Sequence, residues 1–399
     1  MRTISFSPPD ISEREIELVG EAMRSGWITT GPRTKQLEAL LADFCGTEET
    51  ACVNSATAAL ELCLRVLGIG PGDEVITTAY TYTSSASVIS HVGAKTVMVD
   101  TAPGSYFMDY EKLAAAVTPR TKAIIPVDLA GVPVDYKAIQ SIVESKRAVF
   151  TPSDNDIQRA LGRIAIVSDS AHALGTIYDF KPAAIQSDFA CYSFHAVKNL
   201  TTAEGGAIAF SSIGDISADD IYHRFMLLSL HGQSKDALAK TKAGAWEYDI
   251  IYTGYKYNMT DIMAAIGIGQ LERYPALLAR RYAMVKRYNE RLSGSRARPL
   301  VHNGKGWVGS HHLFIVDIEG ATYEERNAVI EKMGAAGISC NVHYKPLPMM
   351  TAYKNLGFDI ADYPNAYDMF TREITLPLHT LLSDDDIDYI ADEFIKATK

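Results

Sequence analysis

The segment Ser193–Asn199 reads SFHAVKN; it closes an apolar run that begins at Phe189, and the glycine-rich stretch TAEGG follows at 202–206. A lysine held at the end of a buried strand is partly desolvated, which lowers its pKa and makes its amine a nucleophile toward an aldehyde. Lys198 is therefore a candidate for imine chemistry. A solvated loop lysine is the alternative interpretation, and the neighbouring segments decide between the two.

The segment Ile164–Gly175, IAIVSDSAHALG, places Asp169 directly after an apolar run. In open α/β sheets, ligands bind outside the carboxyl ends of the strands. A pyridoxal ring needs a carboxylate against its ring nitrogen, which keeps that nitrogen protonated and the ring an electron sink. We expect Asp169 and Lys198 to hold opposite ends of such a ring, although Asp169 could instead cap a helix at Ser170.

A phosphate site is predicted within residues 50–67, where a short strand leads through Asn54-Ser55-Ala56-Thr57 into an amphipathic helix. Free backbone N–H groups and the positive end of the helix dipole favour an anion at such a turn. The hydroxyl groups of Thr57 and Ser55 could add donors. The phosphate of the cofactor would then lie beside the ring that Asp169 and Lys198 hold.

Between residues 50 and 210, short apolar runs alternate with helical patterns, which predicts an α/β domain with a mainly parallel, seven-stranded sheet. The expected helices include 110–117 and 136–144, and the polar stretch 146–163 looks like a surface insertion, either a hairpin or a mobile loop. The apolar runs are Cys52–Val53, Val75–Ile76, Lys95–Val99, Ala123–Val127, Ile164–Val167, Phe189–Phe194 and Ala207–Phe210.

Two domains are expected, a large one over residues 1–262 and a smaller α+β domain over 263–399. The second begins with a long helix to about Leu292 and continues with a strand at 312–317, a helix at 323–335 and the segment 338–343. Small residues near the start of the long helix would let another helix approach closely. Core packing alone could explain these small residues, which are Ala264, Ala265, Gly267 and Gly269.

Composition limits the class of protein. With 47% hydrophobic and 22% charged residues, the 399-residue chain is globular. No apolar run approaches the roughly 20 residues that cross a bilayer, and the start, MRTISFSPPD, lacks a signal region, so we expect a cytoplasmic protein without a membrane partner. A net charge of −10 argues against nucleic acid. No metal site is expected, because the five cysteines are scattered and adjacent His311 and His312 would point to opposite faces of a strand.

Six segments together, in order along nearly the whole chain, resemble the DegT/StrS family of pyridoxal-phosphate sugar aminotransferases, which have fold type I. They are SGWITTGP from Ser25, NSATAAL from Asn54, ITTAYTYTSSA from Ile76, SDSAHALG from Ser168, SFHAVKN from Ser193 and GYKYNMTDIMAAIG from Gly254. The resemblance implies that pyridoxal 5′-phosphate (PLP) is bound as an imine by Lys198, with Asp169 on the pyridinium nitrogen.

The resemblance also implies the remaining cofactor contacts. His172 would lie near the ring face or its phenolic oxygen, and Tyr82 would stack on the other face; a packing role is the alternative for both. Phosphate contacts would come from Ala56, Thr57 and Ser193. Trp27 and His343 would lie near the sugar, although His343, in NVHYKPLP, could equally be structural.

One segment departs from the commonest family pattern, GYNYRM, because Lys256 replaces the asparagine and Asn258 replaces the arginine. In the family this loop reaches the phosphate site of the neighbouring subunit, which implies a homodimer with shared active sites. Lys256 could serve there as a point charge, but without the planar fork of an arginine.

The activity that the resemblance implies is transfer of an amino group from L-glutamate, through pyridoxamine phosphate (PMP), to a nucleotide-linked keto-sugar, for a surface polysaccharide, a glycan or an antibiotic. GYKYNMTD and HGQSKDA, from His231, favour the C4 position over C3. A dehydrase of the family would carry His in place of Lys198, and a silent scaffold would be expected to lose Lys198 or Asp169. A Rossmann dehydrogenase is disfavoured because no GxGxxG follows the first strand.

Overall fold

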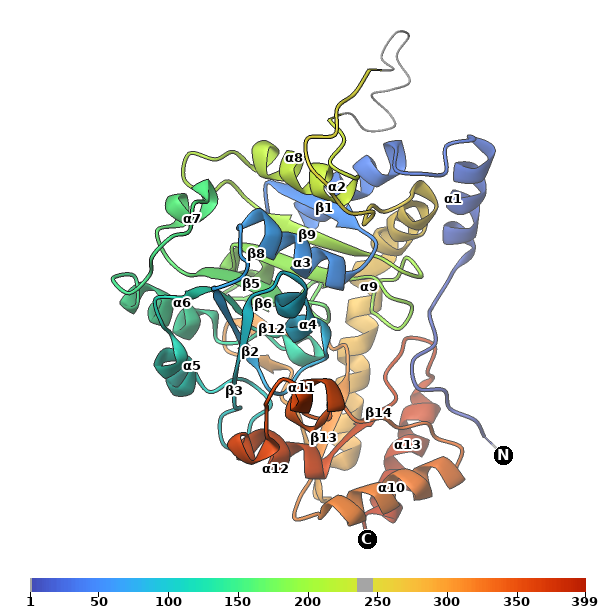
Figure 1. Ribbon diagram of the computed structural model, residues 1–399. Coiled ribbons are helices and arrows are strands. Elements are labelled where there is room, and N and C mark those ends of the chain that lie inside the picture. The colour runs from blue at the N-terminus through green and yellow to red at the C-terminus, as the bar shows by residue number, and fades with distance from the viewer. Residues whose placement is uncertain (1, 235–246) are drawn as a thin grey trace.

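The structure, a computed structural model, describes residues 2–234 and 247–399. A large α/β domain is built around a seven-stranded sheet, and a smaller domain formed by the C-terminal part of the chain lies below it in the view of Figure 1. The long helix α9, Asp261–Leu292, runs from one to the other.

The central sheet has the strand order β1-β9-β8-β5-β4-β2-β3. Only β9 runs antiparallel to its neighbours, so the prediction of a mainly parallel seven-stranded sheet is confirmed. Its strands are β1 Glu49–Val53, β2 Glu74–Thr78, β3 Lys95–Val99, β4 Thr121–Ile125, β5 Ala165–Asp169, β8 Phe189–Ser193 and β9 Gly206–Phe210.

Both faces of this sheet are covered, because alternate strand residues enter different hydrophobic cores. Along β8, Phe189 and Cys191 pack with helices α3 (Ala56–Val66), α4 (Ser84–His91) and α8 (Ala218–Ser229). Ala190 and Tyr192 pack on the other face with α1 (Glu13–Arg24), α2 (Pro32–Cys45) and α9. Towards β3 that second face is covered by α5 (Tyr110–Ala116) and α6 (Tyr136–Ser145).

The stretch 146–163 is not a hairpin. It contains the short helix α7, Asp156–Leu161, whose N-cap is Asn155. The Asn155 Nδ2 atom donates to the carbonyl of Val66 at 2.9 Å, and Gln158 Nε2 donates to the carbonyl of Leu67 at 2.6 Å. The carbonyls at the end of a helix lack intrahelical partners. Polar residues that suggested a free surface loop therefore anchor the segment to the end of α3.

The smaller domain has a three-stranded antiparallel sheet, β10-β13-β14, covered by helices. The predicted strand at 312–317 is β13, Phe314–Ile318, and the predicted helix at 323–335 is α10; residues 338–343 form only isolated bridges. Near the N-terminus, Ile4 packs into this domain and bonds through its backbone to Gly337 and Ser339. The other elements are β10 Ala297–Pro299, β14 Glu373–Leu376, α10 Tyr323–Ala335, α11 Thr351–Asn355, α12 Pro364–Arg372 and α13 Asp384–Ala397.

A second small sheet joins the two domains, with the order β11-β12-β6-β7. The hairpin of β6 (Ile177–Tyr178) and β7 (Lys181–Pro182) comes from the large domain, whereas β11 (Asn303–Gly304) and β12 (Trp307–Val308) come from the C-terminal part. Val308 pairs with Ile177 across this boundary.

The small residues at the start of α9 accommodate helices of the same chain. A Cβ atom on Gly267 would lie 2.7 Å from Leu37 of α2, and one on Gly269 would lie 3.2 Å from the Cα atom of Glu15 in α1. Packing within the chain therefore explains these residues, and they give no support to the inference of a homodimer.

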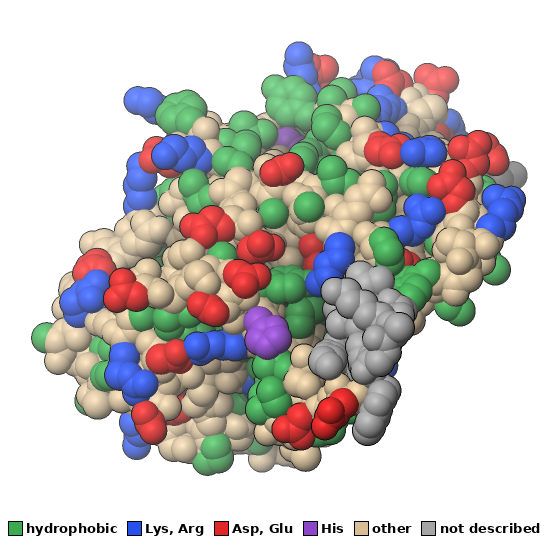
Figure 2. All heavy atoms as spheres, turned by 90° about the horizontal axis from the view of Figure 1, so that it is seen from above, with side chains coloured by type: hydrophobic (Ala, Val, Ile, Leu, Met, Phe, Trp, Pro, Cys, Tyr) green, Lys and Arg blue, Asp and Glu red, His purple; other side chains and the backbone are tan. Residues whose placement is uncertain are grey.

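The surface carries both signs of charge. Figure 2 shows Asp and Glu side chains interspersed with Lys and Arg side chains over the face seen from above. Among the described residues, no helix is long and apolar enough to cross a membrane.

Candidate active site

A cavity of about 540 Å³ lies at the carboxyl-terminal edge of the central sheet. Its walls come from the residues that follow β1, β2, β4, β5 and β8, and from segments of the smaller domain and the N-terminus. Of the residues singled out in the sequence, the cavity brings together Ala56, Thr57, Tyr82, Asp169, His172, Ser193, Lys198 and His343.

Lys198 lies in the tight turn after β8, where its N–H donates to the carbonyl of His195 at 2.9 Å. Burial lowers the pKa of the Lys198 amine to about 8, and this effect outweighs the opposing attraction of Asp169. A larger fraction of the amine is therefore neutral, and so nucleophilic, near neutral pH than for an exposed lysine.

Asp169 is the last residue of β5, and both of its carboxylate oxygens are held. Oδ2 accepts from the Ser85 hydroxyl at 2.6 Å, and Oδ1 accepts from the Ala171 N–H at 3.2 Å. Burial raises the pKa of Asp169, and within the described residues no cationic side chain forms an ion pair with it. A protonated ring nitrogen placed beside it would supply the missing positive charge.

The turn before α3 has the features of an anion site. Ser55 is the N-cap, and its hydroxyl accepts from the N–H of Ala58 at 3.1 Å. The N–H groups of Ala56 and Thr57, in the first turn of the helix, have no protein acceptor within the described residues. Gly206 lies directly against this turn, since a Cβ atom there would be 2.6 Å from the nitrogen of Ala56.

His172 is held as a neutral hydrogen-bond donor. Its Nδ1 atom accepts from the N–H of Ala130 at 3.1 Å, so the ring proton is on Nε2, which lies 3.3 Å from the Tyr344 hydroxyl. Burial keeps the pKa of His172 well below its ordinary value, and the positive charge of Lys198 lowers it further. The imidazole can therefore donate a hydrogen bond into the cavity without carrying charge.

Tyr82 forms an open wall of the cavity; 59% of it is exposed, and its ring lies 6.0 Å from that of Tyr344. This leaves room for a planar ring against it. The sequence assigned no role in the site to several other residues of the cavity or its support, among them Phe6, Ser85 and His312. Tyr344 lies beside His343 in the segment that the resemblance places near the sugar, and Ser85 lies in the segment from Ile76, but nothing in the spacing of Ser85 marked it.

Three residues predicted for the site lie outside this cavity and close to one another. The indole of Trp27 donates to the carbonyl of Thr30 at 3.0 Å, and the amide of Asn258 donates to the Thr30 hydroxyl at 2.7 Å. Asn258 also bridges Val53 at the end of β1, and the exposed Lys256 is two residues away. The contacts proposed for Trp27, Lys256 and Asn258 stay predictions.

The pair His311 and His312 faces different neighbours. The ring of His311 stacks on His302 with centroids 5.2 Å apart, whereas His312 lies 4.4 Å from the ring of His172. Nδ1 of His312 is bonded to the amide oxygen of Asn199 at 2.9 Å. The described residues hold no group of three His, Cys, Asp or Glu side chains that could bind a metal ion.

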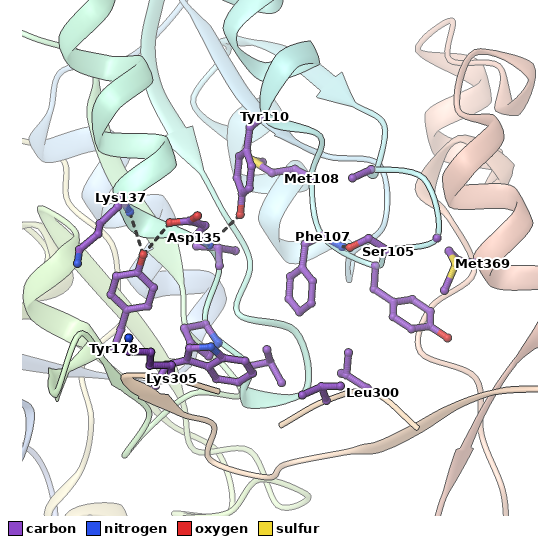
Figure 3. Close-up of a pocket in the computed structure, with 18 of the residues that line it drawn as sticks. Ser105, Phe107, Met108, Tyr110, Asp135, Lys137, Tyr178, Leu300, Lys305 and Met369 are labelled. Atoms are coloured by element: carbon purple, nitrogen blue, oxygen red, sulfur yellow. Dashed lines mark hydrogen bonds between the residues drawn. The ribbon is translucent and has the colours of Figure 1, made fainter. Parts of the chain in front are cut away.

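A larger hollow, of about 670 Å³, opens between the two domains. Figure 3 shows the Tyr178 hydroxyl bonded to Asp135, with Tyr110, Phe107 and Lys305 around the same space. None of the site residues predicted from the sequence lines it. The 540 Å³ cavity is therefore the candidate active site.

The residues of that cavity fit PLP. Lys198, with its lowered pKa, would bind the aldehyde, the buried carboxylate of Asp169 would face the ring nitrogen, and the free N–H groups at the start of α3 would bind the phosphate. The neutral Nε2–H of His172 provides a donor for an oxygen of the ring.

The comparisons with known proteins agree. Residues 9–395 match the model of the DegT/DnrJ/EryC1/StrS aminotransferase family. The spore coat polysaccharide biosynthesis protein SpsC of Bacillus subtilis is 36% identical over 396 residues, covering 96% of this chain and 94% of SpsC.

Solved structures extend the likeness. Spr1654 of Streptococcus pneumoniae, provisionally named a sugar aminotransferase, is 56% identical in its PMP form, with a TM-score of 0.97 and 99% of each chain covered. It has also been solved in a PLP form. DesI, solved in the presence of its TDP-sugar product, is 25% identical with a TM-score of 0.83, covering 100% of this chain and 94% of DesI. The chain thus belongs to the DegT/DnrJ/EryC1/StrS aminotransferase family and is a sugar aminotransferase of fold type I that uses PLP.

Proposed function

We propose that the enzyme transfers the amino group of L-glutamate to a nucleotide-linked keto-sugar at C4. The observation that carries this proposal is the convergence of Lys198, Asp169 and the start of α3 on one cavity. The TDP-sugar of DesI supports a nucleotide-linked acceptor, and SpsC supports a product that enters a polysaccharide.

When bound, PLP withdraws electrons from the substrate carbon, so that its α-proton can leave. Lys198 would hold PLP through its amine, and the free amine would take that proton as a general base and return a proton to the acceptor in the second half-reaction. Because Lys198 acts from one side of the ring, it sets the stereochemistry of the new amine.

The other side chains of the cavity hold the cofactor in place. The fixed carboxylate of Asp169 keeps the ring nitrogen protonated, and His172 donates from Nε2 to an oxygen of the ring. The N–H groups of Ala56 and Thr57, with the hydroxyl groups of Thr57 and Ser193, bind the phosphate. Tyr82 would cover one face of the ring and limit the access of water to it.

The loop that holds Lys256 and Asn258 is the part of the chain that favours a homodimer with shared active sites, because in the family this loop reaches the phosphate site of the neighbouring subunit. These residues lie outside the cavity of their own chain, yet they border the turn before α3: the N–H of Asn54 donates to the carbonyl of Tyr257 at 2.7 Å. Lys256 would supply a positive charge to the phosphate of the partner subunit's cofactor.

Two segments of the sequence favour C4 as the position of amination. C4 rests on GYKYNMTD and on the segment 231–237, of which residues 235–237 lie outside the described part of the chain. Amination at C3 is the alternative. No arginine lines the cavity within the described residues, so the carboxylates of glutamate need cationic partners from outside these walls.

An absorbance experiment tests the donor and the acceptor. We expect the purified holoenzyme to absorb between about 300 and 500 nm as a PLP enzyme, to lose the long-wavelength band on addition of L-glutamate, and to regain it with one member of a panel of nucleotide 4-keto and 3-keto sugars. Recovery with a 3-keto sugar alone would move the amination to C3. If glutamate leaves the long-wavelength band unchanged and another amino acid removes it, that amino acid is the donor instead of glutamate.

Loading of the cofactor should depend on pH through Lys198. Only the neutral amine attacks an aldehyde, and burial holds the pKa of Lys198 at about 8. We expect the rate at which the apoprotein takes up PLP, followed by absorbance, to rise roughly tenfold per pH unit below about 8 and to level off above it. A rate that still climbs between pH 9 and 10 would show an ordinary, exposed lysine.

A further inference from the structure

A hydrogen-bonded chain leads from the active-site cavity to a buried carboxylate in β14. His343 lines the cavity, and its Nδ1 atom lies 3.0 Å from the hydroxyl of Thr375. That hydroxyl lies 2.5 Å from Oε1 of Glu373, and Oε2 of Glu373 accepts from the backbone N–H of His343 at 2.9 Å. Glu373 and Thr375 are both inaccessible to solvent.

The imidazole of His343 is fixed in orientation. Its ring stacks on Phe6 with centroids 5.6 Å apart, and the carbonyl of His343 accepts from the hydroxyl of the buried Tyr80 at 3.1 Å. With Nδ1 committed to Thr375, Nε2 is the atom available to a ligand, and no group of the described residues forms a hydrogen bond with it.

The chain of hydroxyl and carboxyl groups has two self-consistent states, because the hydroxyl of Thr375 has one proton to donate. When Glu373 is ionised, Thr375 donates to it and accepts from Nδ1–H of His343, which leaves Nε2 as an acceptor. When Glu373 is protonated, it donates to Thr375, Thr375 donates to Nδ1, and Nε2 carries the proton.

The two states differ by one proton. A proton that binds Nε2 from the cavity releases the Nδ1 proton to Thr375, and Thr375 passes its own proton to Glu373. The N–H bond at Nδ1 and the O–H bond of Thr375 break, and new bonds form at Nε2, at the Thr375 oxygen and at Glu373, with the one extra proton coming from the cavity. The ring of His343 is neutral before and after. The charge change takes place on Glu373, inside the protein.

We propose that Glu373, acting through Thr375, is a positioning residue that sets which neutral tautomer His343 presents to the sugar substrate. The inference rests on the proposed function for the identity of that ligand. In the state with Glu373 protonated, Nε2–H donates to an oxygen of the keto-sugar; in the ionised state it cannot.

The electrostatic surroundings favour this exchange near physiological pH. Burial raises the pKa of Glu373 to about 8, against its hydrogen bonds and the nearby cation of Arg326. Burial, and to a smaller extent the positive charge of Lys198 across the cavity, also lower the pKa of His343 to about 3, so its ring stays neutral. The donor form therefore dominates below about pH 8 and is lost as the pH rises through that value. Burial raises the pKa of the tyrosines and the cysteine around Glu373, so they stay uncharged, and Arg326 on α10 is the cation beside them. These uncharged groups are Tyr80 and Tyr106 of the large domain, Cys340 and Tyr344.

The test reads the tautomer directly, without cofactor or substrate. Long-range ¹H–¹⁵N spectra of deuterated protein labelled with ¹⁵N-histidine, with His343→Asn to assign the signal, should show His343 changing from the Nε2–H to the Nδ1–H form with a midpoint near pH 8. In Glu373→Gln, the side-chain amide donates to Thr375 at every pH, so the Nε2–H form should persist to pH 10.

Two variants of Thr375 are matched controls should Glu373→Gln fail to fold. Thr375→Val keeps the shape but removes the hydroxyl, so the midpoint should vanish; Thr375→Ser keeps the hydroxyl and should restore it. Each variant is first checked by thermal melting. A wild-type tautomer that does not change between pH 6 and 10, or a midpoint unaltered in both Glu373→Gln and Thr375→Val, overturns the proposal.

Steady-state kinetics then connect the switch to the sugar. The KM for the keto-sugar should rise about tenfold between pH 7 and 9 in the wild type, the change expected for one lost neutral hydrogen bond, and stay flat in Glu373→Gln, while the KM for glutamate behaves alike in both. If the KM for the keto-sugar changes with pH in the same way in the wild type and in Glu373→Gln, the proposed role of Glu373 toward the sugar is refuted. A tautomer switch in an enzyme that accepts no keto-sugar would instead refute the proposed function and leave the relay standing.

Discussion

Replacing Lys198 by Ala is expected to reduce amino transfer by at least about 10⁴-fold, the upper range for the loss of a general base, because the covalent link to the cofactor is lost with it. The variant should also lack the long-wavelength absorbance of the bound cofactor. The absorbance spectrum of the variant mixed with PLP measures the second effect, and formation of 2-oxoglutarate from L-glutamate in single-turnover assays measures the first. Turnover near the wild-type rate would remove Lys198 from the reaction.

The matched control for this variant is Lys112→Ala. The Nζ atom of Lys112 pairs with Asp100 at 2.9 Å, and Lys112 does not line the cavity, so its loss should leave the spectrum and the rate unchanged. Lys198→Ala should still fold. The folded pKa of Lys198, about 8, lies below its unfolded value, so its charge destabilises the apoprotein below that pH. This destabilisation decreases as the pH rises from about 8 towards the pKa of Lys198 in the unfolded chain. At pH 7 we therefore expect the apo variant to melt no lower than the wild-type apoprotein.

Replacing Asp169 by Asn is expected to slow proton removal about 10³-fold, equivalent to about 4 kcal/mol of barrier, while the cofactor stays bound. An amide cannot keep the ring nitrogen protonated, so the ring becomes a poorer electron sink. The amide can still bond to Ser85 and to the N–H of Ala171, which preserves the geometry. Stopped-flow measurement of the half-reaction with glutamate, using α-deuterated donor to isolate the proton step, provides the rate.

Asp100→Asn is the control for Asp169→Asn. Asp100 is also a buried acid just past a strand of the same sheet, but it bonds to Lys112 and to the N–H of Ala366, and it does not line the cavity. Its loss should lower the melting temperature without changing the spectrum or the rate of proton removal. An equal slowing in both variants would mean that Asp169 acts through stability rather than on the ring.

The main sheet was predictable because its strands are short and mostly buried on both faces, so that a short apolar run marks each of them. The same logic failed for 146–163, where polar side chains bond to the carbonyls at the end of α3 rather than to water. The segment 338–343 forms only single bridges to Ile4 and Thr375, so its partners too lie far away in the sequence. Local patterns do not record partners that are distant in the sequence.

The candidate site was predictable where residues follow strands of one sheet. The ends of parallel strands meet at one edge, so Asp169, Ser193 and the turn at Ala56 had to lie near one another. Residues contributed by loops and by the second domain had no such constraint. Trp27 and Asn258 accordingly lie outside the cavity, whereas Phe6 and His312 line it although the sequence assigned them no role there.

The sequence by itself indicated the mainly parallel sheet, the candidate imine-forming lysine, its acidic partner and the turn that fits a phosphate, because short apolar runs that alternate with helical patterns mark the strands and the residues that follow them. Only the tertiary structure decided the protonation and orientation of these groups. Ser85 fixes Asp169, Ala130 fixes the tautomer of His172, and Glu373 contacts His343 across 30 residues of chain. Burial and hydrogen bonding set those states, and both arise from packing between segments that the linear sequence does not place together.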